Sequence, residues 1–294
     1  MLKNISLDDK YKLENKFILV NGTQALVRAT LIQKFRDEKE NLKTAGFVTG
    51  YRGSPVGNVD LQFSKVKKLI SEKDIKFHPG LNEDIAATSL WGSQQAEMRG
   101  ESNYDGVFGF WYGKGPGVDR SGDVFRHSNL AGTSKNGGVI AAMGDDHSGE
   151  SSTVLFQSEY AFKDAMIPIL SPSGVQELID YSILGWGLSR YAGVWVGLKC
   201  LKDTIDATEV VDGSPDKLKI IYPENPVKRG ELSIRVGDTP HAQEERLHRQ
   251  KLPAVKKFAL ENKIDREGFK KTKLSKIGII SSGKSWLDVE HALE

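Results

Sequence analysis

One acidic side chain, Glu83, stands where a predicted strand leads into a helix, within the stretch FHPGLNEDIAATSLWGSQQAE at residues 77–97. Asn82 precedes it and is a typical N-cap residue, because its side-chain oxygen accepts hydrogen bonds from the free N–H groups of the first turn. In open α/β sheets, ligands bind at the edge where strands lead into helices. Position alone leaves two interpretations open: Glu83 serves a ligand, or it only stabilises the positive end of the helix dipole.

Four segments that follow predicted strands are rich in glycine and polar residues. They are residues 49–56 (TGYRGSPV), 78–84 (HPGLNED), 113–120 (GKGPGVDR) and 144–152 (GDDHSGESS). In a parallel sheet such segments share one edge, and glycine lets another backbone or a ligand approach closely. We expect the four to line one cleft, although each by itself is also typical of an ordinary turn.

Signatures of nucleotide and metal sites are weak. The GKGPG string lacks the GKS or GKT ending of a P-loop, and no GxGxxG follows the first predicted strand. Two histidines and three acids, namely His127, His147, Asp145, Asp146 and Glu150, do not form a ligand set that a regular element could aim at one ion, so no metal ligands are predicted. His147 remains either a proton donor or substrate-binding group, or a loop histidine bonded to backbone.

Composition narrows the class of protein further. The chain has 294 residues, 38% hydrophobic and 27% charged, with a net charge of +2, which predicts a folded protein without a nucleic-acid partner. Its single cysteine, Cys200, excludes a Cys-based zinc site or iron–sulfur cluster within these residues. Neither a signal peptide nor an apolar run long enough for a membrane helix is found, so a soluble, cytoplasmic protein is predicted.

Apolar strands that alternate with helical patterns predict an α/β fold with a mostly parallel twisted sheet flanked by helices. The strands are expected at residues 17–20, 47–48, 75–78, 106–111, 137–143, 167–170 and 193–198. We assign residues 1–208 to this α/β domain and residues 209–273 to a connector that contains a helix. Residues 274–294 would open a second α/β domain, which is cut short because one strand and one helix cannot bury a sheet.

Longer strings carry a resemblance to a known family. GYRGSPVGNVD, FHPGLNEDIAATSLWGSQ, GVFGFWYGKGPGVDRSGDVFRHSNLAGTSKNGGVIAAMGDDHSGESST and QSEYAFKDAMIPILSPSGVQELIDYSILGWGLSRYAG follow one another in order. They resemble the N-terminal domain of the indolepyruvate ferredoxin oxidoreductases, thiamine diphosphate-dependent enzymes of 2-oxoacids, in the long single-chain form of bacteria. The resemblance covers residues 21–201 and continues more loosely to KIGIISSGKSWLDVEHAL.

This resemblance implies the pyrimidine-type domain of a thiamine diphosphate-binding fold. Glu83 would be the catalytic glutamate that contacts the pyrimidine ring, while Arg52, Ser54 and His147 would bind the substrate. The remaining cofactor contacts implied are Gly53, Pro55, Asn82, Arg120 and Asn129.

The resemblance also implies parts that this sequence lacks. The GDG…N motif that holds the diphosphate through Mg²⁺ is absent, as are the CxxC runs of iron–sulfur clusters. We therefore expect a partial chain, inactive alone, that needs downstream domains or a partner subunit, self-associates, and decarboxylates indolepyruvate or another arylpyruvate to an acyl-CoA with ferredoxin as acceptor. Two alternatives are a non-catalytic module of the same fold that pairs with another subunit, and a transketolase-like enzyme.

Overall fold

The computed structural model describes residues 6–150, 154–224, 227–228, 230–269, 273 and 276–294. Its centre is a six-stranded sheet in the order β3-β2-β4-β5-β7-β6, and every neighbouring pair is parallel. The strands are β2 (Thr44–Gly50), β3 (Ile75–Phe77), β4 (Gly106–Lys114), β5 (Val139–Asp145), β6 (Ile169–Leu170) and β7 (Trp195–Leu201). The predicted α/β class with a parallel sheet is confirmed.

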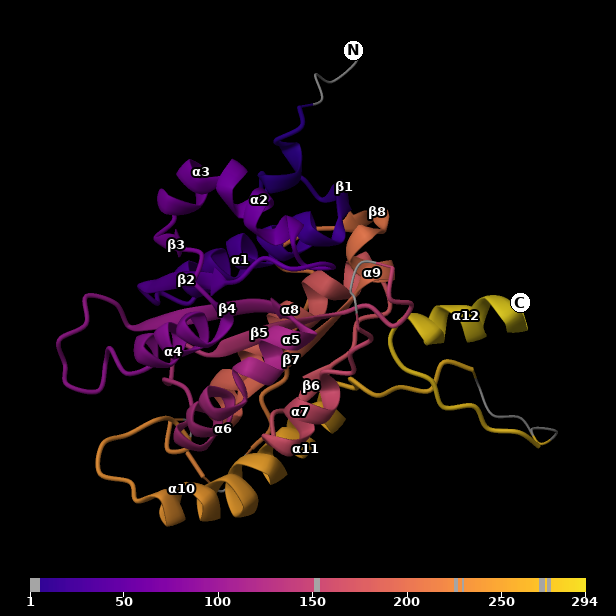
Figure 1. Ribbon diagram of the computed structural model, residues 1–294. Helices are drawn as coiled ribbons and strands as arrows, with labels where there is room; N and C mark the ends of the chain where they lie inside the picture. Colours follow the sequence, from indigo (N-terminus) through magenta and orange to yellow (C-terminus); the bar gives the residue numbers. More distant parts are fainter. Residues whose placement is uncertain (1–5, 151–153, 225–226, 229, 270–272, 274–275) are drawn as a thin grey trace.

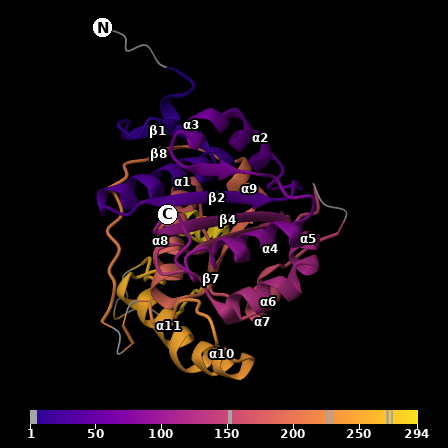
Figure 2. The ribbon, with the colours of Figure 1, turned by 90° about the vertical axis from the view of Figure 1, so that its left-hand side faces the viewer.

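Helices cover both faces of the sheet, as Figure 2 shows. One face packs against α1 (Gly22–Lys39), α2 (Asn58–Lys65), α3 (Lys67–Ser71) and α8 (Val175–Ala192). The other packs against α4 (Glu83–Ser93), α5 (Gly115–Arg120), α6 (Gly122–Ala131) and α7 (Glu159–Asp164). Strand β4 serves both layers, because side chains alternate along a strand: Phe110 and Tyr112 belong to the first core and Trp111 to the second.

The first strand of the chain does not belong to the parallel sheet. β1 (Phe17–Asn21) pairs antiparallel with β8 (Thr208–Asp212) in a separate two-stranded ribbon. The predicted domain boundary at residue 208 therefore cuts into a strand. The fully buried Arg28 of α1 strengthens this junction, because its guanidinium donates to the backbone carbonyls of Lys10, Lys12, Asn15 and Gly213. A short 3-10 helix, Asp9–Tyr11, precedes β1.

The predicted connector is packed against the domain over part of its length. After α9 (Lys202–Asp206) and β8, the chain forms α10 (Pro240–Arg246), a π-helical turn (Leu247–Lys251) and α11 (Leu252–Glu261). Leu247, Ala254 and Phe258 are buried in the same core as α8. Residues 217–222 of the connector form no strand.

The last described segment stands apart from the layers. Residues 276–280 pair with no strand in the part of the chain that is described, and Ile277, Ile279 and Ile280 are exposed. Helix α12 (Lys284–Leu293) has no buried residue and projects away from the sheet in Figure 1. Residues 270–272 and 274–275 lie outside the described residues, and a second domain from residue 274 stays a prediction. Within the described ranges, no helix combines the length and apolar character needed to cross a membrane.

Candidate functional site

The candidate site lies at the carboxyl edge of the sheet, between β2 and β4. From β2 the chain continues to β3 on one side, and from β4 it continues to β5 on the other. Such a change of direction opens a crevice outside the strand ends. The segments that follow the strands meet there: Gly80 N–H donates to Gly50 O at 2.8 Å, and Tyr51 N–H donates to Tyr112 O at 3.0 Å.

Glu83 is the first residue of α4 and is only 8% exposed. The predicted N-cap is confirmed, since the Asn82 side-chain oxygen accepts from Ile85 N–H at 2.9 Å. Trp111 Nε1 donates to the backbone oxygen of Glu83 at 3.0 Å and thereby fixes this residue against the sheet. Ala86 is buried on the same turn, whereas Ile85 is 46% exposed.

The side chain of Glu83 contacts Gly117 but is not hydrogen-bonded to the described part of the chain. Among the described residues we find no hydrogen bond or ion pair to it. Gly117 of α5 lies directly against the side chain: a Cβ on that glycine would stand 2.3 Å from Glu83 Cγ and 2.6 Å from Oε1. A carboxyl group on a nearly buried residue, with no internal partner, is available to a ligand.

The GKGPG string is not the loop that its glycines predict. Lys114 is the last residue of β4, and Gly115 begins α5 with Pro116 in the first turn. Proline is well tolerated there because its missing N–H has no intrahelical partner in any case. Phe156, from the segment after β5, lies over Gly115, where a Cβ would be 2.1 Å from its ring.

The segment after β2 closes the crevice from the other side. Arg52 is exposed, Gly53 and Ser54 are half-buried, and Pro55 is buried after a cis peptide bond. Pro55 packs against the end of β5, since a Cβ on Gly144 would meet its Cδ at 3.2 Å. The segments after β2, β3, β4 and β5 are therefore brought together as predicted, with Ser151 and Ser152 of the last one outside the described residues.

A partly buried pair, Asp60 and Tyr112, lies beside this segment and was not predicted from the sequence. The Tyr112 hydroxyl donates to the carboxylate of Asp60 on α2. Burial raises the pKa of Asp60, and this hydrogen bond and the charge of Arg52 act in the opposite direction. Burial and Asp60 together raise the pKa of Tyr112. The sequence signals this pair only through the position of Asp60 in a helix pattern and of Tyr112 at the end of a strand pattern.

The segment after β5 presents His147 to solvent. The neighbouring Asp145 is buried, accepts from Ser158 N–H at 2.9 Å and Ser158 Oγ at 2.6 Å, and has its pKa raised by burial. Asp146 accepts from its own loop at Gly149 N–H. Asp145 and Asp146 thus shape the loop, and within the described residues no group of three or more metal-binding side chains lies together.

Two predicted cofactor contacts take other roles. The Asn129 amide donates to the carbonyls of Ala165 and Met166, and its oxygen accepts from Trp195 N–H at the start of β7. Asn129 therefore lies at the amino edge of the sheet, opposite the candidate site. Arg120 is exposed and donates to Asp84 at 2.7 Å, which ties the end of α5 to the start of α4.

The chain has relatives among curated proteins. It is 24% identical over 276 residues to the indolepyruvate oxidoreductase subunit IorA of Methanothermobacter marburgensis, covering 93% of this chain and 40% of that protein. It is 26% identical over 282 residues to the subunit of the same name from Pyrococcus abyssi, covering 94% and 39%. The resemblance to the indolepyruvate oxidoreductases is confirmed. The chain spans about two fifths of the length of these relatives.

A solved structure supports the fold of this chain. The 2-oxoglutarate:ferredoxin oxidoreductase of Magnetococcus marinus superposes with a TM-score of 0.62 at 13% identity, over 95% of this chain and 51% of that chain. No family model matches the chain.

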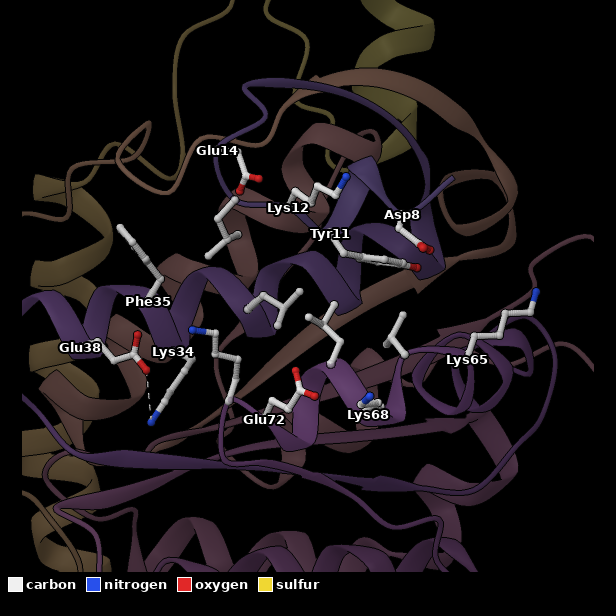
Figure 3. Close-up of a pocket in the computed structure, with 15 residues that line it drawn as sticks. Asp8, Tyr11, Lys12, Glu14, Lys34, Phe35, Glu38, Lys65, Lys68 and Glu72 are labelled. Carbon is white, nitrogen blue, oxygen red and sulfur yellow. Dashed lines mark ion pairs between the residues drawn. The ribbon is translucent and has the colours of Figure 1, made fainter. Parts of the chain in front are cut away.

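Two well-formed cavities of this chain lie away from Glu83. One of about 690 Å³ opens between the segment around Tyr11, helix α1 and helix α3, and mixes lysines with acids, as Figure 3 shows. Another of about 1010 Å³ separates α8 from the segment that leads to α12. Glu83 lines neither of these two cavities.

Proposed function

We propose that this chain is the part of a thiamine diphosphate-dependent 2-oxoacid oxidoreductase that binds the aminopyrimidine half of the cofactor. Its curated relatives are named as indolepyruvate oxidoreductase subunits. The structural neighbour is described with 2-oxoglutarate, coenzyme A and succinyl-CoA bound. The substrate class is therefore a 2-oxoacid, and we propose indolepyruvate or another arylpyruvate within it.

The observation that carries this proposal is the state of Glu83. Glu83 is a nearly buried residue, its side chain lies against Gly117, which has no side chain, and its carboxyl group has no partner among the described residues. The aminopyrimidine ring of thiamine diphosphate offers a ring nitrogen that can share a proton with a carboxyl group. The cofactor would thus supply the partner that the Glu83 carboxyl group lacks, and the residues present fit it.

Each residue around Glu83 then has a defined task. Glu83 holds a proton at its carboxyl oxygen toward the ring nitrogen, and Gly117 leaves space for both groups. Trp111 keeps the backbone of Glu83 in position, and Asn82 sets the first turn of α4. Bound thiamine diphosphate supplies the electron sink that decarboxylation of a 2-oxoacid requires.

The segment after β2 is proposed to form the substrate side of the crevice. Gly53, Ser54 and Pro55 come close to the strand ends, with Arg52 and His147 further out toward solvent. The Ser54 hydroxyl is suited to a hydrogen bond with a carboxylate. Asn129 has no part in this site, because its amide is fully used at the opposite edge.

The remaining parts of the reaction are assigned to other domains or to another subunit. We propose that the diphosphate and its Mg²⁺, the iron–sulfur clusters, the coenzyme A site and the ferredoxin contact belong to further domains or to a partner subunit. The chain alone would then be inactive. Self-association and a cytoplasmic location are part of the same proposal.

Neutralising Glu83 tests the proposal in the complete enzyme. Glu83→Gln keeps the shape of the side chain but removes its acid, so 2-oxoacid-dependent reduction of ferredoxin should fall by about 100-fold or more. Thiamine diphosphate binding, measured by calorimetry, should weaken much less. Asp123→Asn, which alters an exposed acid in the first turn of α6, should leave the rate within about threefold. Unchanged turnover in Glu83→Gln would refute the role given to this residue.

A further inference from the structure

Lys114 lies at the carboxyl end of β4, beside the point between β2 and β4 where the strand order changes direction. It is the last residue of β4, and β4 is the neighbour of β2 in the sheet. Its stem crosses the segment after β2, because a Cβ on Gly53 would lie 2.7 Å from Lys114 Cδ and 2.8 Å from Cγ. Gly53 thus leaves the channel in which the lysine stem runs. Lysine stems are often buried in this way while the ammonium group reaches polar surroundings.

The cations at this edge of the sheet differ in their partners. Three of them are paired with acids: Arg120 with Asp84, Lys199 with Glu159, and Lys202 with Glu150. For Lys114, by contrast, neither a hydrogen bond nor an ion pair is found within the described ranges. Lys114 is a half-buried residue, and its ammonium group is therefore available to an anion that the protein itself does not provide.

The position of Lys114 relative to Glu83 indicates which anion this is. Helix α5 begins immediately after Lys114, and Gly117 in its first turn touches the side chain of Glu83. The cation and the acid are thus linked through one turn of helix. In a 2-oxoacid the carboxylate is bonded directly to the reacting carbonyl carbon, so its cationic partner must stand close to the residue that contacts the cofactor.

Arg52 is less well placed for this task. Its side chain is exposed, and its charge acts on the half-buried carboxylate of Asp60, which also accepts from the Tyr112 hydroxyl. Of the two cations beside the segment after β2, Lys114 is therefore the less exposed and Arg52 the more exposed.

We propose that Lys114 binds the carboxylate of the 2-oxoacid substrate, and that Gly53 is required because it makes room for the lysine stem. This inference rests on the proposed function and names the substrate-binding cation of the same site. A charge-assisted hydrogen bond of this kind strengthens binding of an acid but not of its neutral ester.

Binding of an unreactive acid tests the inference without turnover. In the complete enzyme, calorimetry would compare indole-3-lactate with its methyl ester. Lys114→Met keeps the stem over Gly53 but removes the charge, so the Kd of the acid should rise about 10- to 100-fold while that of the ester stays unchanged. Lys114→Arg should retain part of the affinity, and Lys65→Met on the exposed surface of α2 should retain all of it.

Turnover supplies a second readout. With indole-3-pyruvate, Lys114→Met should raise KM by a similar factor and change kcat little, which is the pattern expected when uniform binding is lost. If Lys114→Met does not fold, Gly53→Ala, which displaces the stem, replaces it and should weaken binding of the acid selectively. Equal affinity for the acid in wild type and variant, together with inactive Glu83→Gln, would overturn this inference alone. Full activity of Glu83→Gln would instead refute the proposed function.

Discussion

Gly117 faces the side chain of Glu83 so closely that a methyl group on its Cα would lie 2.3 Å from Glu83 Cγ. Contacts between real Cβ atoms and neighbouring heavy atoms do not come this near, so any larger residue must push the glutamate aside. The two residues come from different strand–helix units, α4 and α5. Their contact therefore sets the position of the carboxyl group relative to the end of β4.

Gly117→Ala should accordingly weaken binding of thiamine diphosphate by about tenfold, since the displaced carboxyl group of Glu83 loses its hydrogen bond to the aminopyrimidine ring. Calorimetry on the complete enzyme measures this. Gly122→Ala at the start of α6 is a matched control, because a Cβ there meets nothing within 4 Å. The same Kd in both variants would mean that the Gly117 contact does not position the cofactor-binding group.

Asn82→Ala should lower the free energy of unfolding by about 1 kcal/mol, because the first turn of α4 loses the acceptor for Ile85 N–H. Urea unfolding followed by circular dichroism measures the loss. Asn82→Asp keeps the acceptor and serves as the control. A loss in Asn82→Ala no larger than in Asn82→Asp would show that the cap is not what stabilises this turn.

Arg190→Met should destabilise the fold by about 3–5 kcal/mol. The Arg190 guanidinium donates to both carboxylate oxygens of Asp37 at 2.6 and 2.8 Å, and both side chains are buried. Removing the arginine leaves a buried charge without its counterion. The double change Arg190→Met with Asp37→Asn should cost less than Arg190→Met alone, and urea unfolding of the three proteins measures the order. A larger loss in the double variant would contradict this account.

Lys251 predicts a dependence of stability on pH. It is fully buried and donates to Leu130 O at 3.3 Å. Burial lowers its pKa to about 7, Arg246 and Arg235 act in the same direction, and Asp238 opposes them. An unfolded lysine titrates near about 10.4. Between these values the unfolded state binds more protons, so stability should rise with pH from about 7 to about 10 and fall as the pH is lowered.

The measurement is urea unfolding at about pH 7.5 and about pH 9. Wild type should gain about 1–2 kcal/mol more than Lys251→Met between these conditions. Lys256→Met, an exposed position on α11, should behave as wild type. If Lys251→Met retains the whole gain, the dependence arises from other groups.

Local patterns predicted the parts of the fold that local forces determine. The strand before α4, the Asn82 cap and the parallel direction of the sheet strands follow from short-range sequence signals, as does the clustering of post-strand segments. The apolar run of β1 looks like any sheet strand, yet it pairs with β8 almost two hundred residues later. Nothing in a local window specifies such a pairing, which depends on the packing of α1 and α8.

The candidate site shows the same division. Glu83 and the segment after β2 were found from residue types and position, and their untested roles remain proposals. The Asn129 amide is bonded at the opposite edge to backbone groups of Ala165, Met166 and Trp195. No sequence motif indicates these hydrogen bonds. The contact of Gly117 with Glu83 could not be predicted either, because the effect of a glycine depends on which residue lies next to it in space.

The antiparallel ribbon has a consequence for engineering. Phe17 pairs with Asp212, and Gly213 N–H donates to Lys16 O at 2.8 Å, so the two ends of the α/β unit lie side by side. A transplanted unit must nevertheless extend through α11, because Leu247, Ala254 and Phe258 complete the core beside α8. A domain insertion should therefore keep β1, β8 and α11 together, so that the ribbon stays paired and the core stays closed.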